Sequence, residues 1–316
     1  MKGGILILLA SAALSAALCA AAIPLLRRMK AGQPILGYVR EHTGKGGTPT
    51  MGGVAFLLAA ALCALAFGLL RDKRTAVAVA LGTAGSAVGF LDDFLKLRFR
   101  RNLGLRSYQK IAFQVLLALI AGAYCYAAGI TRVNVPFTHL SFGLGAWTVP
   151  CVAFVFLAAS NCVNLTDGLD GLAASAGFWY FASFAALIAL AEGSSPAARL
   201  CLALCGALAG YLLFNTYRAS VFMGDTGSLG LGGYAAAVAA LSGNLLHVAV
   251  VGVMFVCSGI SVIVQVIYYK KTGRRFFRMA PLHHHFQQCG FAESKIAFAY
   301  SFVTAAAGLL CVYFLL

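Results

Sequence analysis

Long apolar stretches separated by short polar loops dominate this sequence of 316 residues. Hydrophobic residues make up 61% of the chain and charged residues only 10%, whereas soluble domains carry about 25% charged residues. A membrane-spanning helix needs roughly 20 mostly apolar residues. The chain is therefore predicted to be an all-α polytopic membrane protein, a single integral membrane domain over residues 1–316 with ten transmembrane helices. The expected spans are residues 4–26, 51–70, 75–94, 110–129, 146–166, 171–191, 199–217, 227–242, 246–269 and 294–316.

The first apolar stretch, residues 4–26, is expected to remain a membrane helix rather than to act as a signal peptide. The apolar core of a signal peptide is usually about 7–15 residues long, and this stretch is longer. Arg27 and Arg28 follow it at once.

Basic residues set the expected orientation. Lys and Arg total 24 against nine acidic residues, a net charge of +15. With the N-terminus outside, 18 of these 24 residues fall in the inner segments, as the preference of basic residues for the cytoplasm requires. Both termini are therefore predicted to lie outside, with Arg71–Arg74 as the exception. The excess of basic over acidic residues would attract both anionic lipid headgroups and an anionic substrate. Nucleic-acid binding is not expected, because the basic residues are divided among membrane-bounded loops.

Five of the nine acidic residues lie at the ends of predicted spans, and all five face the predicted inner side. A carboxylate at membrane depth is costly unless it is paired or metal-bound. Three separate inner segments thus deliver carboxylates to one surface. These five residues are Asp92, Asp93, Asp167, Asp170 and Asp225.

The first segment is GFLDDFLK, residues 89–96. Adjacent helical residues point about 100° apart, so Asp92 and Asp93 cannot both face one point squarely. We expect a division of labour, with one carboxylate near a metal and the other near the nucleophile. Lys96 shares their helix face. A helix-end salt bridge is the structural alternative.

The second segment, residues 160–173, contains a polar stripe with a spacing of three. The stripe consists of Asn161, Asn164, Asp167 and Asp170. In a membrane helix such a stripe is expected to face a site or a water-filled cavity, and Gly168 lets the backbone approach a ligand closely. A capped turn between helices is the alternative.

The third segment, residues 215–232, contains Asp225 between glycines at the start of a predicted span. Hydroxyls and backbone N–H groups at a helix N-terminus bind phosphate, and a nearby acid can hold the Mg²⁺ that bridges it. Asp225 is therefore the predicted metal ligand, and Phe222 is placed to stack on a base. Helix N-capping by the GDTGS sequence is the alternative.

Two further segments carry candidate ligand contacts. In MAPLHHHFQ, residues 279–287, three histidines with nearby arginines suit a polyanionic ligand, with zinc binding as the alternative. In GKGGTPTMGG, residues 44–53, Lys45 and Thr50 could contact phosphate or sugar, although the segment lacks the P-loop pattern. The cysteines are expected to act as small buried apolar residues.

Five motifs in this order and spacing resemble the phospho-N-acetylmuramoyl-pentapeptide transferases, within the polyprenyl-phosphate N-acetylhexosamine-1-phosphate transferases. The motifs are GTPTMGG, LDDFLK, NLTDGLDGLA, VFMGDTGSLGLG and PLHHHF. The resemblance implies ten helices in the bacterial cytoplasmic (inner) membrane with the active site among the inner loops. It also implies that undecaprenyl phosphate attacks UDP-MurNAc-pentapeptide, which yields lipid I and UMP with Mg²⁺ present.

The resemblance also implies roles for individual residues. Asp225 corresponds to the metal-binding aspartate, and Asp92 to the acid that deprotonates the lipid phosphate, with Asp93 beside it. The implied nucleoside contacts are Lys45, Asp170, Asn215 and Phe222. The rest of the implied nucleotide-sugar site is Thr50, Asn164, Asp167, Gln265, His283, His284 and His285. Further expected contacts are Lys96, Lys110, Asn161 and Gly168, and His283 is also expected to act in catalysis.

Several alternatives stay open at this point. A polyprenyl-phosphate GlcNAc-1-phosphate transferase is the rival of the same class, and a secondary transporter with an acidic ion path is the rival of a different class. Transporters place such acids near the midplane, whereas here they gather at one face. The sequence does not determine whether the chain forms a homodimer, or whether transfer is direct or passes through a covalent aspartyl-phosphate. The segment GYVREHTGKGG, residues 37–47, departs from the family pattern.

Overall fold

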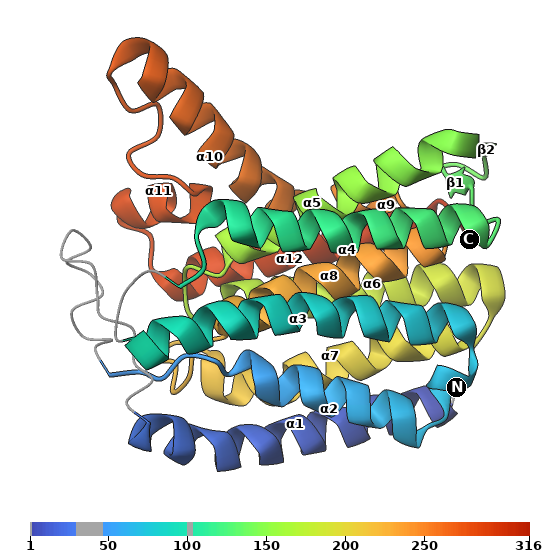
Figure 1. Cartoon of the computed structure of the whole chain (residues 1–316), viewed down its shortest axis with the longest axis horizontal. Coiled ribbons are helices and arrows are strands. Elements are labelled where there is room, and N and C mark those ends of the chain that lie inside the picture. Colours follow the sequence, from blue (N-terminus) through green and yellow to red (C-terminus); the bar gives the residue numbers. More distant parts are fainter. Residues whose placement is uncertain (1, 30–46, 100–103) are drawn as a thin grey trace.

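The computed structural model describes residues 2–29, 47–99 and 104–316, which form a bundle of long helices lying side by side (Figure 1). Helix α10 leans away from the bundle, and the short helix α11 lies beside it at the end opposite the termini (Figure 1). The helices are α1 (Lys2–Arg28), α2 (Gly53–Ala66), α3 (Lys73–Phe99), α4 (Ser107–Ala127), α5 (Thr148–Thr166), α6 (Leu172–Glu192), α7 (Pro196–Asn215), α8 (Gly224–Leu241), α9 (His247–Val251), α10 (Val253–Thr272), α11 (Leu282–Gln288) and α12 (Glu293–Tyr313), with 3₁₀ turns η2 (Leu69–Arg71) and η3 (Gly145–Trp147).

Eight helices within the described residues are long and apolar enough to cross a membrane. Of the other two expected spans, α2 has 14 residues and α8 has 18 residues, and both lie within the same bundle. The chain is therefore an all-α polytopic membrane protein, and the count of ten spans stays a prediction. Both termini lie at the same end of the bundle (Figure 1), as an even number of crossings requires.

Two local features differ from the sequence prediction. The ninth expected span, residues 246–269, is not one helix: it breaks at Gly252 into α9 and α10. Gly252 leaves the helical region at φ −86° and ψ 21°, and its N–H still caps α9 by donating to the carbonyl of Val248. In addition, the loop after α4 contains a small antiparallel hairpin of β1 (Arg132–Asn134) and β2 (Ser141–Gly143).

Close packing of α3 against α8 brings the acidic residues together. Gly82, Gly85 and Gly89 line the face of α3 that meets α8. A Cβ added at Gly85 would lie 3.0 Å from the carbonyl oxygen of Leu229, and one added at Gly89 would lie 2.6 Å from the backbone nitrogen of Thr226. Small residues let two helix backbones approach in this way. The last turns of α3 therefore meet the first turn of α8.

At the opposite end of the bundle, Asp72 and Glu192, which are not among the five acids at the predicted inner side, have local partners. Asp72 precedes α3, and its Oδ2 accepts hydrogen bonds from the backbone N–H of Thr75 at 2.8 Å and from the Thr75 hydroxyl at 2.7 Å. Glu192 at the end of α6 lies 3.8 Å from Arg74. Part of the basic cluster on the predicted outer side is thus paired with acid.

Candidate active site

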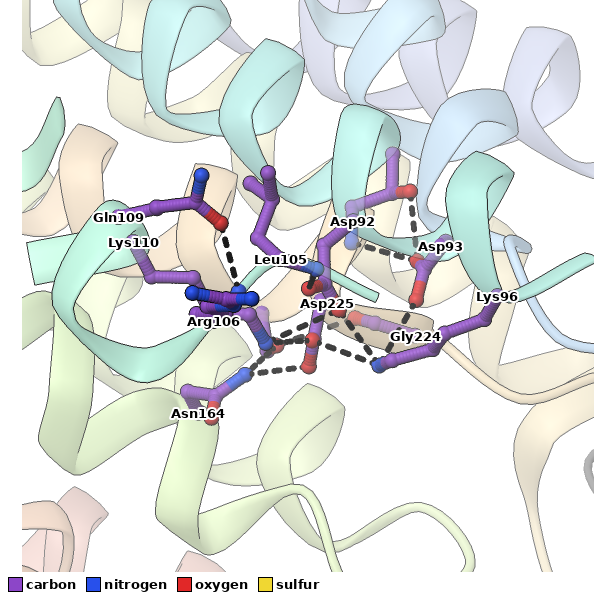
Figure 2. A network of polar contacts seen from close by, with 12 residues as sticks. Asp92, Asp93, Lys96, Leu105, Arg106, Gln109, Lys110, Asn164, Gly224 and Asp225 are labelled. Atoms are coloured by element: carbon purple, nitrogen blue, oxygen red, sulfur yellow. Dashed lines mark hydrogen bonds and ion pairs between the residues drawn. The ribbon is translucent and has the colours of Figure 1, made fainter. Parts of the chain in front are cut away.

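Asp92, Asp93 and Asp225 form one cluster where α3 ends and α8 begins (Figure 2). One carboxylate oxygen from each residue lies within 4.8 Å of the others, so the three could hold a metal ion together. Asp92 and Asp93 are almost completely buried. Asp92 and Asp93 have different partners, as expected for residues that do not face one point squarely, yet both reach the cluster because α8 begins so close to α3.

Asp93 is fixed by the first turn of α8. Its Oδ2 accepts hydrogen bonds from the backbone N–H of Thr226 at 2.9 Å and from the Thr226 hydroxyl at 2.8 Å. Gly224, at φ +71°, lies directly against this carboxylate: an added Cβ would be 2.6 Å from Asp93 Oδ2 and 2.7 Å from the Thr50 hydroxyl. The donors of Thr226, which the sequence suggested for phosphate, therefore hold Asp93.

Asp92 is held by a segment that the sequence analysis did not single out. The backbone N–H of Leu105 donates to Asp92 Oδ1 at 2.7 Å. Gly104 packs against the same carboxylate, since an added Cβ would lie 2.6 Å from Oδ1. Because any residue except proline can donate a backbone N–H, the sequence does not reveal the contact of Leu105. Its one indication is Gly104, a glycine in a loop rich in basic residues.

Two lysines neutralise much of the cluster's negative charge. Lys96 Nζ lies 2.6 Å from Asp92 Oδ2, 3.6 Å from Asp93 Oδ1 and 2.9 Å from Asp225 Oδ2. Lys110, from the first turn of α4, lies 2.9 Å from Asp92 Oδ2 and 2.5 Å from Asp225 Oδ2. The prediction that Lys96 shares a face with both aspartates is confirmed, and Lys110 joins them from another helix.

One member of the predicted polar stripe contacts the cluster directly. The side-chain amide of Asn164 donates to Asp225 Oδ1 and to Ser228 Oγ, both at 2.8 Å. Asn161 instead donates to Gln114 Oε1 at 2.7 Å and to the carbonyl of Leu157 at 2.8 Å. Asn161 therefore joins α5 to α4, and its predicted contact with substrate has no support from these bonds.

Asp170 and Asn215, predicted to lie near the nucleoside, bind backbone in this structure. The backbone N–H of Ala219 donates to Asp170 Oδ2 at 3.1 Å. Asn215 Oδ1 accepts from the N–H of Gly171 at 3.2 Å, and its amide donates to the carbonyl of Val221 at 2.9 Å. The two side chains thus fix the loops on either side of the α6–α7 pair, and both are buried.

The loop before α8 is paired with the glycine-rich segment before α2. Phe222 donates its backbone N–H to the carbonyl of Pro49 and accepts from the N–H of Gly52, both at 2.8 Å. This pairing holds buried Thr50 beside Gly224. The predicted contact of Lys45 lies outside the described residues.

The predicted histidines lie on α11, and two of them pack against the loop after α5. His283 is completely buried, and neither of its ring nitrogens has a hydrogen-bond partner in the described parts of the chain. Its ring and that of His284 face Gly168, where an added Cβ would lie 3.1 Å from His284 Nε2. Burial, and next the charge of His284, lowers the pKa of His283 to about 3, so its imidazole is neutral near pH 7.

Hydrogen bonds around these histidines hold α11 and the segment that precedes it. His284 Nδ1 lies 3.0 Å from Gln287 Oε1, and His285 Nδ1 accepts the backbone N–H of Arg278 at 3.2 Å. Gln265 of α10 accepts the N–H groups of residues 276 and 277 at 3.1 and 2.9 Å. Gln265 therefore folds the segment between α10 and α11, a structural role that the sequence did not suggest.

Asp167 follows the last residue of α5, next to Gly168. Burial raises its pKa to about 8, and the negative charges of Asp225 and Asp93 add to this effect. This carboxyl group is therefore largely protonated near neutral pH. The sequence predicted a contact with the nucleotide sugar for Asp167 but no unusual protonation.

Comparisons with known proteins agree with this geometry. Residues 75–243 match glycosyl transferase family 4, and residues 45–57 match signature 1 of phospho-N-acetylmuramoyl-pentapeptide-transferase. The chain is thus a polytopic membrane transferase of family 4, and the matched segment contains all three clustered aspartates.

Curated relatives narrow this class further. The phospho-N-acetylmuramoyl-pentapeptide-transferase of Clostridioides difficile (strain 630) is 40% identical over 291 residues, which cover 89% of this chain and 88% of that protein. The enzyme of the same name from Shouchella clausii (strain KSM-K16) is 42% identical over 298 residues, 92% of this chain and 91% of that protein. The chain belongs to the phospho-N-acetylmuramoyl-pentapeptide-transferase family.

Proposed function

We propose that this protein transfers phospho-MurNAc-pentapeptide from UDP-MurNAc-pentapeptide to undecaprenyl phosphate in the bacterial cytoplasmic membrane, producing lipid I and UMP. The observation that carries the proposal is the cluster of three aspartates and two lysines at one end of the bundle. The names of the relatives supply the substrate class. A lipid acceptor suits this site, because its tail can remain in the bilayer while its phosphate reaches the end of the helices.

The donor set fits a divalent cation. Three carboxylates offer oxygens within 4.8 Å of one another, and Mg²⁺ prefers one or two carboxylates completed by phosphate oxygens and waters. We assign Mg²⁺ to Asp225 and Asp92, because Asp93 Oδ2 is committed to Thr226. When bound there, Mg²⁺ would neutralise charge on the pyrophosphate of the nucleotide sugar.

The remaining chemistry belongs to side chains of this chain. Phosphoryl transfer needs positioned groups and charge neutralisation more than covalent help. Lys96 and Lys110 supply positive charge beside Asp225. Because Asp92 is assigned to the metal, the proposed base for the lipid phosphate is Asp93, whose Oδ1 has no hydrogen-bond partner among the described residues. The resemblance alone had pointed to Asp92 for this role.

Helix α11, which carries His283, His284 and His285, is the proposed binding site for the nucleotide sugar. The buried ring of His283 has both nitrogens available among the described residues, and a neutral imidazole can donate at one nitrogen and accept at the other. The rings of His283 and His284 pack directly against Gly168. In this proposal a bound ligand separates α11 from the loop after α5 and directs its phosphates toward the aspartates.

A release assay tests the proposed function. Purified protein in detergent, with undecaprenyl phosphate and Mg²⁺, is given UDP-MurNAc-pentapeptide or UDP-GlcNAc, and UMP is measured. We expect UMP and a lipid-linked muramoyl product from the first substrate only. UMP release from UDP-GlcNAc alone would assign the chain to the rival specificity, and release from neither would contradict a transferase function.

A further inference from the structure

Lys96 and Lys110 contact the same two carboxylate oxygens. Asp92 Oδ2 lies 2.6 Å from Lys96 Nζ and 2.9 Å from Lys110 Nζ. Asp225 Oδ2 lies 2.9 and 2.5 Å from the same two ammonium groups. Figure 2 shows Lys96 of α3 and Lys110 of α4 reaching these carboxylates from opposite sides.

The other oxygen of each carboxylate has a partner of a different kind. Asp92 Oδ1 accepts the backbone N–H of Leu105 at 2.7 Å. Asp225 Oδ1 accepts the amide of Asn164 at 2.8 Å. These partners orient each carboxylate so that Oδ2 faces the centre of the cluster. A divalent cation shared by Asp92 and Asp225 must therefore use the oxygens that the lysines contact.

The two kinds of contact oppose each other. Mg²⁺ binds oxygen at about 2.0–2.1 Å, and an ammonium that stays within hydrogen-bond distance of the same oxygen would then face a doubly charged ion at close range. Like charges at such a separation repel strongly in a partly buried site. Both lysine side chains are about one quarter exposed, at 23% and 25%. Their flexible stems allow them to move away without any change in the backbone.

We propose that Lys96 and Lys110 compete with the divalent cation for Asp92 and Asp225, so that metal binding releases both ammonium groups toward the phosphates of the substrate. This inference rests on the proposed function, because it takes the metal and the nucleotide sugar from it. The lysines then have two successive partners. Before the metal binds they offset the repulsion among three carboxylates, and afterwards they offset the charge of the pyrophosphate.

Binding of Mn²⁺, measured by electron paramagnetic resonance of the unbound ion, tests the competition without substrate or turnover. The full-length protein in detergent is compared with Lys96→Met and Lys110→Met. Removal of a competing charge should tighten Mn²⁺ binding at least about fivefold in each variant, since a charge at contact distance is worth more than this. Unchanged or weaker binding in both variants would overturn the proposal.

Two matched variants separate direct contact from general charge. Lys110→Arg keeps a charge beside Asp225 and should not tighten Mn²⁺ binding; a guanidinium that pairs with both carboxylates should weaken it. Arg98→Met removes one charge from the exposed end of α3, where no contact with the aspartates is seen in the described residues, and should also stay within about twofold. Equal tightening in Arg98→Met and Lys110→Met would assign the effect to net charge and overturn the competition.

Asp225→Asn shows whether the metal site or the competition has failed. If the wild type and Asp225→Asn bind Mn²⁺ alike, the metal assignment in the proposed function is wrong and the competition is wrong with it. If Asp225→Asn loses the site but neither methionine variant binds more tightly, only the competition is wrong. Because both lysines contact the same oxygens, one methionine variant that elutes as a single folded species is sufficient for the test.

Discussion

Thr226 supplies both hydrogen bonds that hold Asp93 Oδ2, one from its backbone and one from its hydroxyl. Thr226→Val removes the hydroxyl and should lower stability by about 2 kcal/mol, the scale of a hydrogen bond to a charged group. Turnover should also fall, because Asp93 is the proposed base. Thr226→Ser keeps the hydroxyl and serves as the control; an unchanged Tm in Thr226→Val would contradict this account.

Asp167 should make stability depend on pH. Its pKa rises from 3.8 in the unfolded chain to about 8 in the folded protein, first through burial and then through the charge of Asp225. Between these two pKa values the folded state holds a proton that the unfolded state has released. The contribution of Asp167 to the free energy of unfolding is therefore largest at low pH and is lost as the pH rises toward 8. Asp167→Asn cannot ionise and should lose this slope. Thermal unfolding of both proteins from about pH 5 to 8 checks it; parallel Tm curves would show that Asp167 does not titrate in this range.

The residue types predicted which acids meet, but not what holds them. Asp92, Asp93 and Asp225 could be identified because a carboxylate at the end of an apolar span is costly and needs a partner. The backbone donors of Leu105 and Thr226 could not, since every non-proline residue offers an N–H group. For the same reason, Asp170 and Asn215 were expected at the ligand, whereas in the structure they bind the backbone of neighbouring loops.

The pairing of helices α3 and α8 determines the geometry of the cluster. Gly89→Ala would place a Cβ 2.6 Å from the backbone nitrogen of Thr226, so one helix must shift. Overpacking of this kind costs about 1–3 kcal/mol. We expect a lower Tm and a loss of UMP release, because the shift separates Asp92 from Asp225. Gly3→Ala in α1 meets nothing within 4 Å and should leave both properties unchanged. Wild-type Tm and activity in Gly89→Ala would show that this close contact is not required.

Helix α11 presents its histidines unequally. His283 is fully buried with no hydrogen-bond partner among the described residues, whereas His285 already binds the backbone of Arg278. His283→Ala should therefore lower kcat/KM for UDP-MurNAc-pentapeptide by about 10²-fold or more, the scale of a lost positioned acid–base or hydrogen-bonding group. His285→Ala should cost less than tenfold, on the order of one ordinary hydrogen bond. Equal losses in the two variants would contradict the distinct environments of these rings.

At the level of elements, hydropathy predicted the helices well and their interruptions poorly. Apolar length alone places a helix within each of the expected spans, because backbone groups in a bilayer must be satisfied internally. It does not detect the break at Gly252, since the residues on both sides are equally apolar and only the backbone angles change. The short hairpin of β1 and β2 was missed because each strand has three residues, too few for a periodic pattern.

The two ends of the helix bundle differ in their chemically active groups. One end holds the acidic cluster, α11 and the loops after α5 and before α8, while both termini lie at the other end (Figure 1). In the proposed reaction, the phosphate groups of the substrates would therefore meet the protein at the first end. The excess of basic residues predicted there would attract them and would also set the orientation in the membrane.

Cysteine labelling in intact cells tests that orientation. Phe286→Cys places a thiol at an exposed position on α11, and Ser194→Cys places one in the exposed turn between α6 and α7, at the opposite end of the bundle. The ten native cysteines, of which Cys289 is exposed, must first be replaced. A reagent that cannot cross the membrane should label position 194 in intact cells and position 286 only after the cells are opened. The reverse pattern would place the aspartate cluster outside the cell, away from cytoplasmic nucleotide sugars, and would remove the basis of the proposed function.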